Sequence, residues 1–470
     1  MIVERLTDED ARILARERGP VSGHTCKVLM VDGAHDADQV RLLVGRRLAG
    51  VPQLRNRLVP APLGIAPPAW LPDERFALDR HVRDGGRVED HAALERAVAA
   101  LMAVHLDRAR PLWALDVLSL GGRRTAIVLR LHHCMADGMM AMRIIRTLLL
   151  DPSDDEADSQ RRPDRSSGEL ADATRPRPAA LLADATLWRA GWVARRVAEG
   201  ARTLACRRGN RPDATARRER LAAIHRALAP DGHPSPLARP AGPRRRAAFR
   251  SFPLEDVKAL AHGAPERATV NDVVLAAVAG GLRRLLDNMG AEPHELRVKV
   301  PVSLHRPGEK VLANRDSFMF VSLPLDEPDP LARLLAIAAE TRERKAAHEA
   351  DALDSFFSDL RRWSRSLERL AQRWAMSPRV FAVNVSNVPG PQGRPTVMGS
   401  RLIKMHDLVE IADRHALRVA VVSAADRLSF GLCADAGAVQ RLDLVADGIA
   451  QELRALRAAL PARALESGAR

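Results

Sequence analysis

The sequence of 470 residues contains no tyrosine, and aromatic residues make up only 3% of it. Its net charge of +14 would suit a nucleic-acid partner. Proteins that bind single strands or RNA place aromatic side chains among their basic residues, and duplex readers carry recognisable modules. Neither feature is present here, so we expect no nucleic-acid partner.

Cysteine is also scarce. Four cysteines (Cys26, Cys134, Cys206 and Cys433) lie far apart with no C-x-x-C pair. This spacing excludes a disulfide framework and a cysteine-based zinc site. We therefore expect a protein of a reducing compartment that holds no metal.

Long apolar runs are missing. The longest uncharged run, residues 58–72, contains five prolines, and no stretch reaches the ~18 apolar residues that a membrane-spanning helix needs. The N-terminus carries Glu4 and no apolar segment, so no secretory signal is predicted. We expect a cytoplasmic protein, peripheral at the inner membrane face or at lipid inclusions.

The positive charge is concentrated in one segment. The segment from Arg207 to Arg250 contains twelve arginines and only three acidic residues, so it carries +9 of the total net charge of +14. Lysine is rare, with six residues in the whole chain. A local arginine cluster favours contact with an anionic lipid surface. The positive charge is a property of this segment and not of the whole chain.

Composition divides the chain into three regions. Residues 1–150 and 246–470 alternate helix and strand patterns, and residues 151–245 form a biased, partly helical, Arg/Pro-rich linker. Alternating elements predict an α/β or α+β layer structure in each half. Helix patterns span 37–48, 92–105, 139–150 and 271–286; strand patterns span 125–133, 296–303, 318–325 and 381–385; 417–423 and 428–434 form a predicted hairpin.

Within the linker, residues 179–206 are predicted to form one amphipathic helix. Trp188 and Trp192 follow Leu181 and Ala185 at helical spacing, and arginines lie largely off this stripe. Such a helix suits a membrane interface, or it docks on the globular halves as any linking helix does. Both interpretations remain open at this stage.

The motif His132-His133-Cys134-Met135-Ala136-Asp137-Gly138 closes a predicted strand and opens a predicted helix. Alternation along the strand places His133 after an apolar stripe and His132 on the face of Arg130. A partly desolvated, neutral imidazole suits general-base work on a hydroxyl group. A buried histidine pair without catalysis is the alternative.

Asp137 and Gly138 follow the histidines. Asp137 either braces the loop, and so orients the histidine, or caps the helix that begins next to it, and the two roles are compatible. Gly138 is expected to allow a tight backbone at this turn.

The motif resembles the HHxxxDG motif of CoA-dependent acyltransferases, and its surroundings resemble the bacterial wax ester synthase/diacylglycerol acyltransferase family. Six further stretches follow in family order over roughly residues 6–455: Leu106–Trp113, Thr269–Ala276, Val300–Leu304, Asn314-Arg315, Asn387–Pro391 and Leu428–Leu432. The sequence departs from the family between residues 393 and 426, where Ala424 or Ala425 replaces a tyrosine.

The resemblance implies two chloramphenicol-acetyltransferase-like halves joined by the linker, with a tunnel between them. It also implies transfer of an acyl group from acyl-CoA, as co-substrate and without a further cofactor, to a diacylglycerol or a fatty alcohol. His133 would act as general base, with His132, Asp137 and Gly138 completing the catalytic motif. Contact with an anionic membrane or a lipid-droplet surface would follow from such substrates.

Three further residues are candidates for a role in the site or in the fold. Asn271 either stabilises an oxyanion or positions substrate, or it caps the helix 271–286. Asp272 complements the helix dipole or forms an ion pair. Cys134 is expected to be a small apolar filler and no nucleophile. Two alternatives to the function are a catalytically silent lipid-binding homologue and an acyltransferase for another hydroxyl acceptor.

Overall fold

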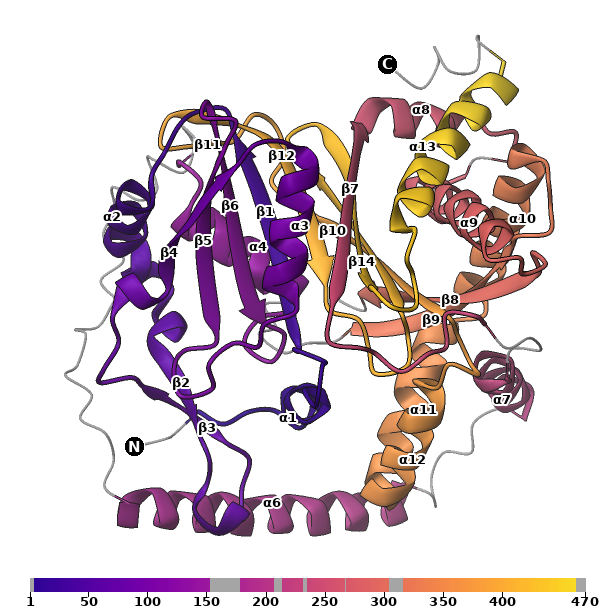
Figure 1. The fold of residues 1–470 in the computed structure, drawn as a ribbon. Coiled ribbons are helices and arrows are strands. Elements are labelled where there is room, and N and C mark those ends of the chain that lie inside the picture. Colours follow the sequence, from indigo (N-terminus) through magenta and orange to yellow (C-terminus); the bar gives the residue numbers. More distant parts are fainter. Residues whose placement is uncertain are drawn as a thin grey trace. The chain divides into compact units, whose positions relative to one another are not determined.

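The computed structural model describes residues 4–152, 178–206, 214–230, 235–266, 268–303 and 316–461 (Figure 1). Two compact units divide the chain. The first comprises Met1–Ala194, Val388–Glu410 and Val422–Asp426, and the second Arg195–Asn387, Ile411–Val421 and Arg427–Arg470. The predicted boundaries at residues 150 and 245 stay a prediction. Leu304, Asn314-Arg315 and parts of the linker 151–245 lie outside the described residues.

The first unit contains a mixed six-stranded sheet. In spatial order its strands are β11 (Thr396–Val397), β12 (Ser400–Val409), β1 (His24–Val31), β6 (Arg124–His132), β5 (Trp113–Leu120) and β4 (Val82–Val88). β1 pairs antiparallel with both β12 and β6, and β4 and β5 are parallel. β12 comes from the segment of poor family resemblance, and its pairing with β1 was not foreseen.

Helices cover both faces of this sheet. α2 (Ala37–Arg47) and α4 (Gly138–Leu148) share a core with Ile127, Leu129 and Leu131 of β6. On the other face Arg130 of β6 donates to the carbonyl of Leu101 in α3 (His91–Met102). α1 (Asp8–Arg16), the hairpin β2 (Asn56–Val59) and β3 (Ala69–Pro72), and 3-10 turns at Leu48–Gly50, Pro52–Arg55, Pro62–Gly64 and Leu78–Arg80 complete the unit.

The predicted linker helix is α6 (Pro178–Cys206). Its first part docks on the first unit, because Leu181 packs with Val59 and Leu71 and Asp184 pairs with Arg5 at 2.5 Å. Trp188 and Trp192 stack, and the Arg189 guanidinium lies 4.9 Å from the Trp192 ring centroid. The docking interpretation is therefore confirmed for the start of α6.

The second unit is built on a second six-stranded sheet. Its strands in spatial order are β7 (Arg245–Pro253), β14 (Arg427–Asp435), β13 (Leu417–Ala424), β10 (Val383–Pro389), β8 (Glu295–Ser303) and β9 (Asp316–Pro324). Its helices are α7 (Ala214–Leu228), α8 (Leu254–Gly263), α9 (Val270–Asn288), α10 (Pro330–Ala346), α11 (Glu349–Trp363), α12 (Arg365–Ala375) and α13 (Leu442–Ala459). α9 is the core helix, because Asp272–Ala279 is buried without a break.

The structure confirms the mixed α/β fold class and the predicted elements to within a few residues. The hairpin from β13 to β14 turns where expected, with Ala425 and Asp426 at φ values of 50° and 59°. Gly and Asn usually occupy such left-handed positions, so Ala425 is an unusual choice. The predicted strand 125–133 ends one residue early, which places His133 in a turn.

We expect the pairing of β1 with β12 to depend on a buried ion pair. Lys27 and Asp407 face each other across these strands, each side chain 1% exposed. Lys27→Met leaves the carboxylate without its lysine and should cost about 3–5 kcal/mol. The double variant Lys27→Met/Asp407→Leu should recover much of that loss. Thermal melting checks both, and equal melting temperatures for wild type and Lys27→Met would contradict the expectation.

Candidate active site at the end of strand β6

The two histidines of the motif lie in different environments. His132 ends β6 and is fully buried, whereas His133 begins the following turn and is half-buried. The apolar side of β6 packs on the α4 core, and its other side places Arg130 and His132 in a buried polar layer. Only His133 of this pair is open to an incoming molecule.

The turn is held by contacts around His132. The N–H groups of Met135 and Ala136 donate to the His132 carbonyl at 2.9 and 3.3 Å, and the Cys134 N–H donates to His132 Nδ1 at 3.2 Å. The His133 N–H donates to the Gly23 carbonyl at 3.0 Å. Because Nδ1 accepts a hydrogen bond, this network assigns the His132 proton to Nε2.

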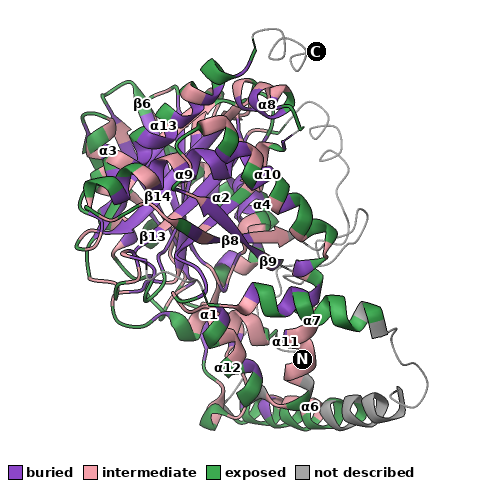
Figure 2. Cartoon of the chain, turned by 90° about the vertical axis from the view of Figure 1, so that its right-hand side faces the viewer, coloured by how far each residue is buried: buried purple, intermediate pink, exposed green. Residues whose placement is uncertain are grey.

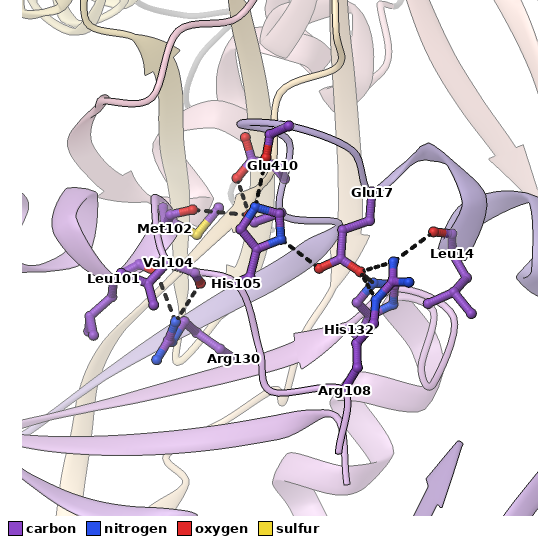
Figure 3. A network of polar contacts seen from close by, with 12 residues as sticks. Leu14, Glu17, Leu101, Met102, Val104, His105, Arg108, Arg130, His132 and Glu410 are labelled. Carbon is purple, nitrogen blue, oxygen red and sulfur yellow. Dashed lines mark hydrogen bonds and ion pairs between the residues drawn. The ribbon is translucent and has the colours of Figure 1, made fainter. Parts of the chain in front are cut away.

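His132 Nε2 faces a buried carboxylate. It lies 3.4 Å from Glu17 Oε2, which also accepts from Arg108 Nε at 2.7 Å. The other oxygen, Oε1, lies 2.8 Å from His105 Nδ1. Figure 3 shows Glu17 between His105 on one side and His132 with Arg108 on the other. We call these four residues the Glu17 cluster.

Burial alone would raise the pKa of Glu17, but its contacts with His132, His105 and Arg108 outweigh burial and lower the pKa to about 2. Glu17 is therefore ionised at neutral pH. A permanent carboxylate at this place attracts the Nε2 proton of His132 and fixes the ring orientation.

Asp137 and Gly138 occupy the start of α4. Asp137 is the N-cap, and its carboxylate accepts from the Met140 N–H at 2.6 Å. This confirms the capping role, and a bracing role toward the histidine stays a prediction. Gly138 has no left-handed backbone; a Cβ on it would lie 3.1 Å from Val388 Cγ2. A larger side chain would therefore crowd Val388, and the turn itself does not call for glycine.

Cys134 is buried and packs with Leu112 and Leu106. Burial raises the pKa of its thiol further above the usual range. A buried, protonated thiol is a poor nucleophile, which agrees with the predicted role as an apolar filler.

Asn271 belongs to the second unit, and the residues of the motif belong to the first. The cap of α9 is Thr269, which forms a capping box with Asp272, so the prediction of Asn271 as N-cap is wrong. Asp272 also accepts from the Thr341 hydroxyl at 2.7 Å and works as a hydrogen-bond acceptor inside the unit. Since Thr269 satisfies the cap, the half-buried Asn271 side chain is not needed for capping.

Sequence reasoning missed most of the Glu17 cluster. Arg108 lies inside the family-like stretch Leu106–Trp113, but Glu17 and His105 carried no motif that singled them out. A second buried histidine, His24, pairs with His132 across β1 and β6. In the sequence, the only sign of this buried histidine is its place directly after Gly23, at the start of an apolar run. Among the described residues, no group of three or more metal-ligating side chains could hold a metal ion.

Comparison with solved structures places this fold in a known class. A wax ester synthase/diacylglycerol acyltransferase from Marinobacter aquaeolei VT8 is similar over 97% of this chain and 99% of that chain, with a TM-score of 0.64 and 24% identity. The first condensation domain of the calcium-dependent antibiotic synthetase gives a TM-score of 0.54 at 18% identity, over 96% of this chain and 95% of its own. The chain therefore shares its fold with this enzyme and with condensation domains.

Sequence comparison defines the family. The model of the wax ester synthase/diacylglycerol acyltransferase catalytic domain matches residues 6–274, and that of the WS/DGAT C-terminal domain matches residues 312–457. A Mycobacterium tuberculosis protein named as a diacylglycerol O-acyltransferase is 31% identical over 93% of both chains. A second from Mycobacterium bovis is 30% identical over 95% of this chain and 94% of its own. The chain belongs to this family and is an acyltransferase, as the sequence predicts.

Two glycines offer a matched test of the His132 environment. Gly23 and Gly19 have φ values of 66° and 55°, so alanine should cost each about 1 kcal/mol in backbone strain. A Cβ at Gly23 would lie 2.7 Å from His132 Nε2, whereas one at Gly19 meets nothing within 4 Å. We expect Gly23→Ala to lose about tenfold or more in turnover and Gly19→Ala to change it little. Equal turnover in the two folded variants would contradict this.

The pH dependence of stability tests the buried layer. Burial, with the charge of Arg130, lowers the pKa of His24 well below its usual 6.5. Below pH 6.5 the unfolded chain therefore binds a proton at His24 that the folded chain does not, so stability falls as pH decreases. The slope is at most about 1.4 kcal/mol per pH unit for one group. As pH decreases below 6.5, the melting temperature of wild type should therefore fall more than that of His24→Leu. Parallel curves for the two proteins would refute this role of His24.

Proposed function

We propose that this protein transfers a fatty acyl group from acyl-CoA to the hydroxyl of a diacylglycerol or a long-chain alcohol, with His133 as general base. His133 accepts the hydroxyl proton while the oxygen attacks the thioester carbonyl carbon. The C–O bond forms, the C–S bond breaks, and His133 returns the proton to the thiolate. The products are an ester and free CoA, and no acyl-enzyme is needed.

One observation carries the role of His133. His133 is half-buried, whereas its neighbour His132 is fully buried. The protein occupies both ring nitrogens of His132, since Nδ1 accepts from the Cys134 N–H and Nε2 lies 3.4 Å from the Glu17 carboxylate. A general base must be reachable by substrate and held in one orientation, and the turn anchored to Gly23 supplies such a support. His132 is too enclosed to meet substrate.

Glu17 acts in this proposal as a positioning residue. Its carboxylate fixes the Nε2–H form of His132, so that Nδ1 stays available to the Cys134 N–H. The backbone hydrogen bonds to His132 then keep the turn that carries His133. A small displacement of a reacting group can cost about 10²-fold in rate.

Asn271 is the candidate for oxyanion stabilisation or substrate positioning in the second unit. Its amide is not required as a helix cap, because Thr269 and Asp272 form the capping box. A side-chain amide near the developing oxyanion would lower the barrier by hydrogen bonding.

The acceptors proposed here are lipids, so the enzyme should work as a peripheral protein at an anionic membrane or a lipid-droplet surface. No described helix is both long and apolar enough to cross a bilayer. The alternatives are a catalytically silent lipid binder and an acyltransferase for a different hydroxyl.

The decisive assay measures thiol release from palmitoyl-CoA with hexadecanol or a diacylglycerol as acceptor. His133→Ala should lower acceptor-dependent release by at least about 10²-fold, because the proton acceptor is lost. His132→Ala should reduce it through the turn, and His262→Ala, which removes an exposed histidine on α8, should leave it unchanged.

Wild-type turnover in a folded His133→Ala protein would refute the mechanism. Binding of acyl-CoA without release, whichever acceptor is offered, would favour the silent lipid binder. Release only with a shorter or differently shaped alcohol would favour another acceptor.

A further inference from the structure

The second unit exposes large apolar side chains along α12 and at the end of α11. Leu367, Leu370 and Trp374 of α12 are 51%, 64% and 38% exposed, and Trp363, which ends α11, is 65% exposed. Intervals of three and four residues place such side chains on one side of a helix. We call these four residues the α12 face. The exposed residues of α12 are green in Figure 2.

The α12 face borders an apolar groove. The groove has a volume of about 460 Å³, and its lining consists only of apolar residues: Leu228, Leu360, Leu367, Leu370, Ala371 and Trp374. The indole N–H of Trp374 donates to the Leu228 carbonyl at 2.8 Å. Since this polar group is already satisfied, the rim of the groove can enter hydrocarbon without losing a hydrogen bond.

Exposed arginines lie on α12 itself and on a neighbouring helix. Arg369 and Arg373 are exposed on α12, in the turns that carry Leu370 and Trp374. Arg217, Arg218 and Arg226 are exposed on α7, which packs against α11. Tryptophan and leucine on one side with arginine beside them are typical of helices that lie in a membrane interface, where guanidinium groups meet lipid phosphates.

Two exposed leucines of the described residues stand alone and serve as a comparison. Leu42 and Leu63, 57% and 88% exposed, stand on separate elements of the first unit. Single exposed apolar residues are ordinary on soluble proteins, whereas a contiguous patch beside positive charge marks an interaction site.

We propose that the α12 face inserts into the surface of an anionic phospholipid layer, with the arginines of α12 and α7 contacting the lipid phosphates. The inference rests on the proposed function in one respect, since lipid acceptors are dissolved in such a layer. The side chains of the α12 face would enter the acyl region of the lipid layer. The arginines of α12 and α7 would favour an anionic surface over a neutral one.

The test uses the full chain and vesicles of phosphatidylcholine with or without phosphatidylglycerol, at matched salt. Wild type should float with the anionic vesicles, and Leu367→Ser/Leu370→Ser should bind them at least about tenfold more weakly. The matched control, Leu42→Ser/Leu63→Ser, removes two exposed leucines elsewhere and should bind as wild type does. Arg369→Gln/Arg373→Gln should reduce the preference for anionic over neutral vesicles.

Equal vesicle binding by wild type and Leu367→Ser/Leu370→Ser would overturn the proposal. Sedimentation without vesicles tests whether a second copy of the chain covers the α12 face instead. A wild-type dimer that Leu367→Ser/Leu370→Ser dissociates would also overturn the proposal. All variants should retain the wild-type melting temperature, because the changed side chains are exposed.

Thiol release in solution, with hexanoyl-CoA and a short alcohol and without vesicles, separates this proposal from the proposed function. The α12 variants should match wild type in that assay and should lose turnover only with vesicle-borne diacylglycerol. Absence of turnover in every protein, with the short substrates and with vesicle-borne diacylglycerol alike, would refute the proposed function and leave the docking surface standing if the vesicles are bound as expected.

Discussion

A buried carboxylate is the constraint on which the candidate site depends. Glu17 comes just after α1, and its contacts with His105, Arg108 and His132 join three separate segments of the first unit. Its contacts lower its pKa to about 2, so it is charged at neutral pH. A buried charge is tolerated only where it is compensated, so these partners cannot be removed one at a time without cost.

The neighbouring residues follow from that carboxylate. His132 must present Nε2 to Glu17, which leaves Nδ1 to close the turn after β6, and this turn carries His133. Gly23 has to be small where its backbone passes the His132 ring. Gly138 passes close to Val388, which comes from the C-terminal half of the sequence.

Local patterns were enough to predict much of this protein, and contacts between distant segments were not. β6, α4 and the hairpin of β13 and β14 could be read from alternation and turn residues, because those signals are local. The pairing of β1 with β12 joins residues about 380 positions apart, such as Lys27 and Asp407, and no local pattern encodes it. His132 and His133 were found by their motif, but Glu17 is an ordinary glutamate in sequence and acquires its role only through folding. The Asn271 cap was misplaced by two residues because Thr269 with Asp272 forms the better capping box.

The steady-state pH profile of Glu17→Gln tests the central claim, that an ionised Glu17 positions the catalytic turn through His132. This substitution keeps the side-chain volume and removes the charge. With palmitoyl-CoA and hexadecanol, we predict a kcat reduced by about 10²-fold, a KM within about twofold of wild type and a changed pH profile of kcat/KM. A folded Glu17→Gln protein with wild-type kcat and the wild-type pH profile would contradict the account.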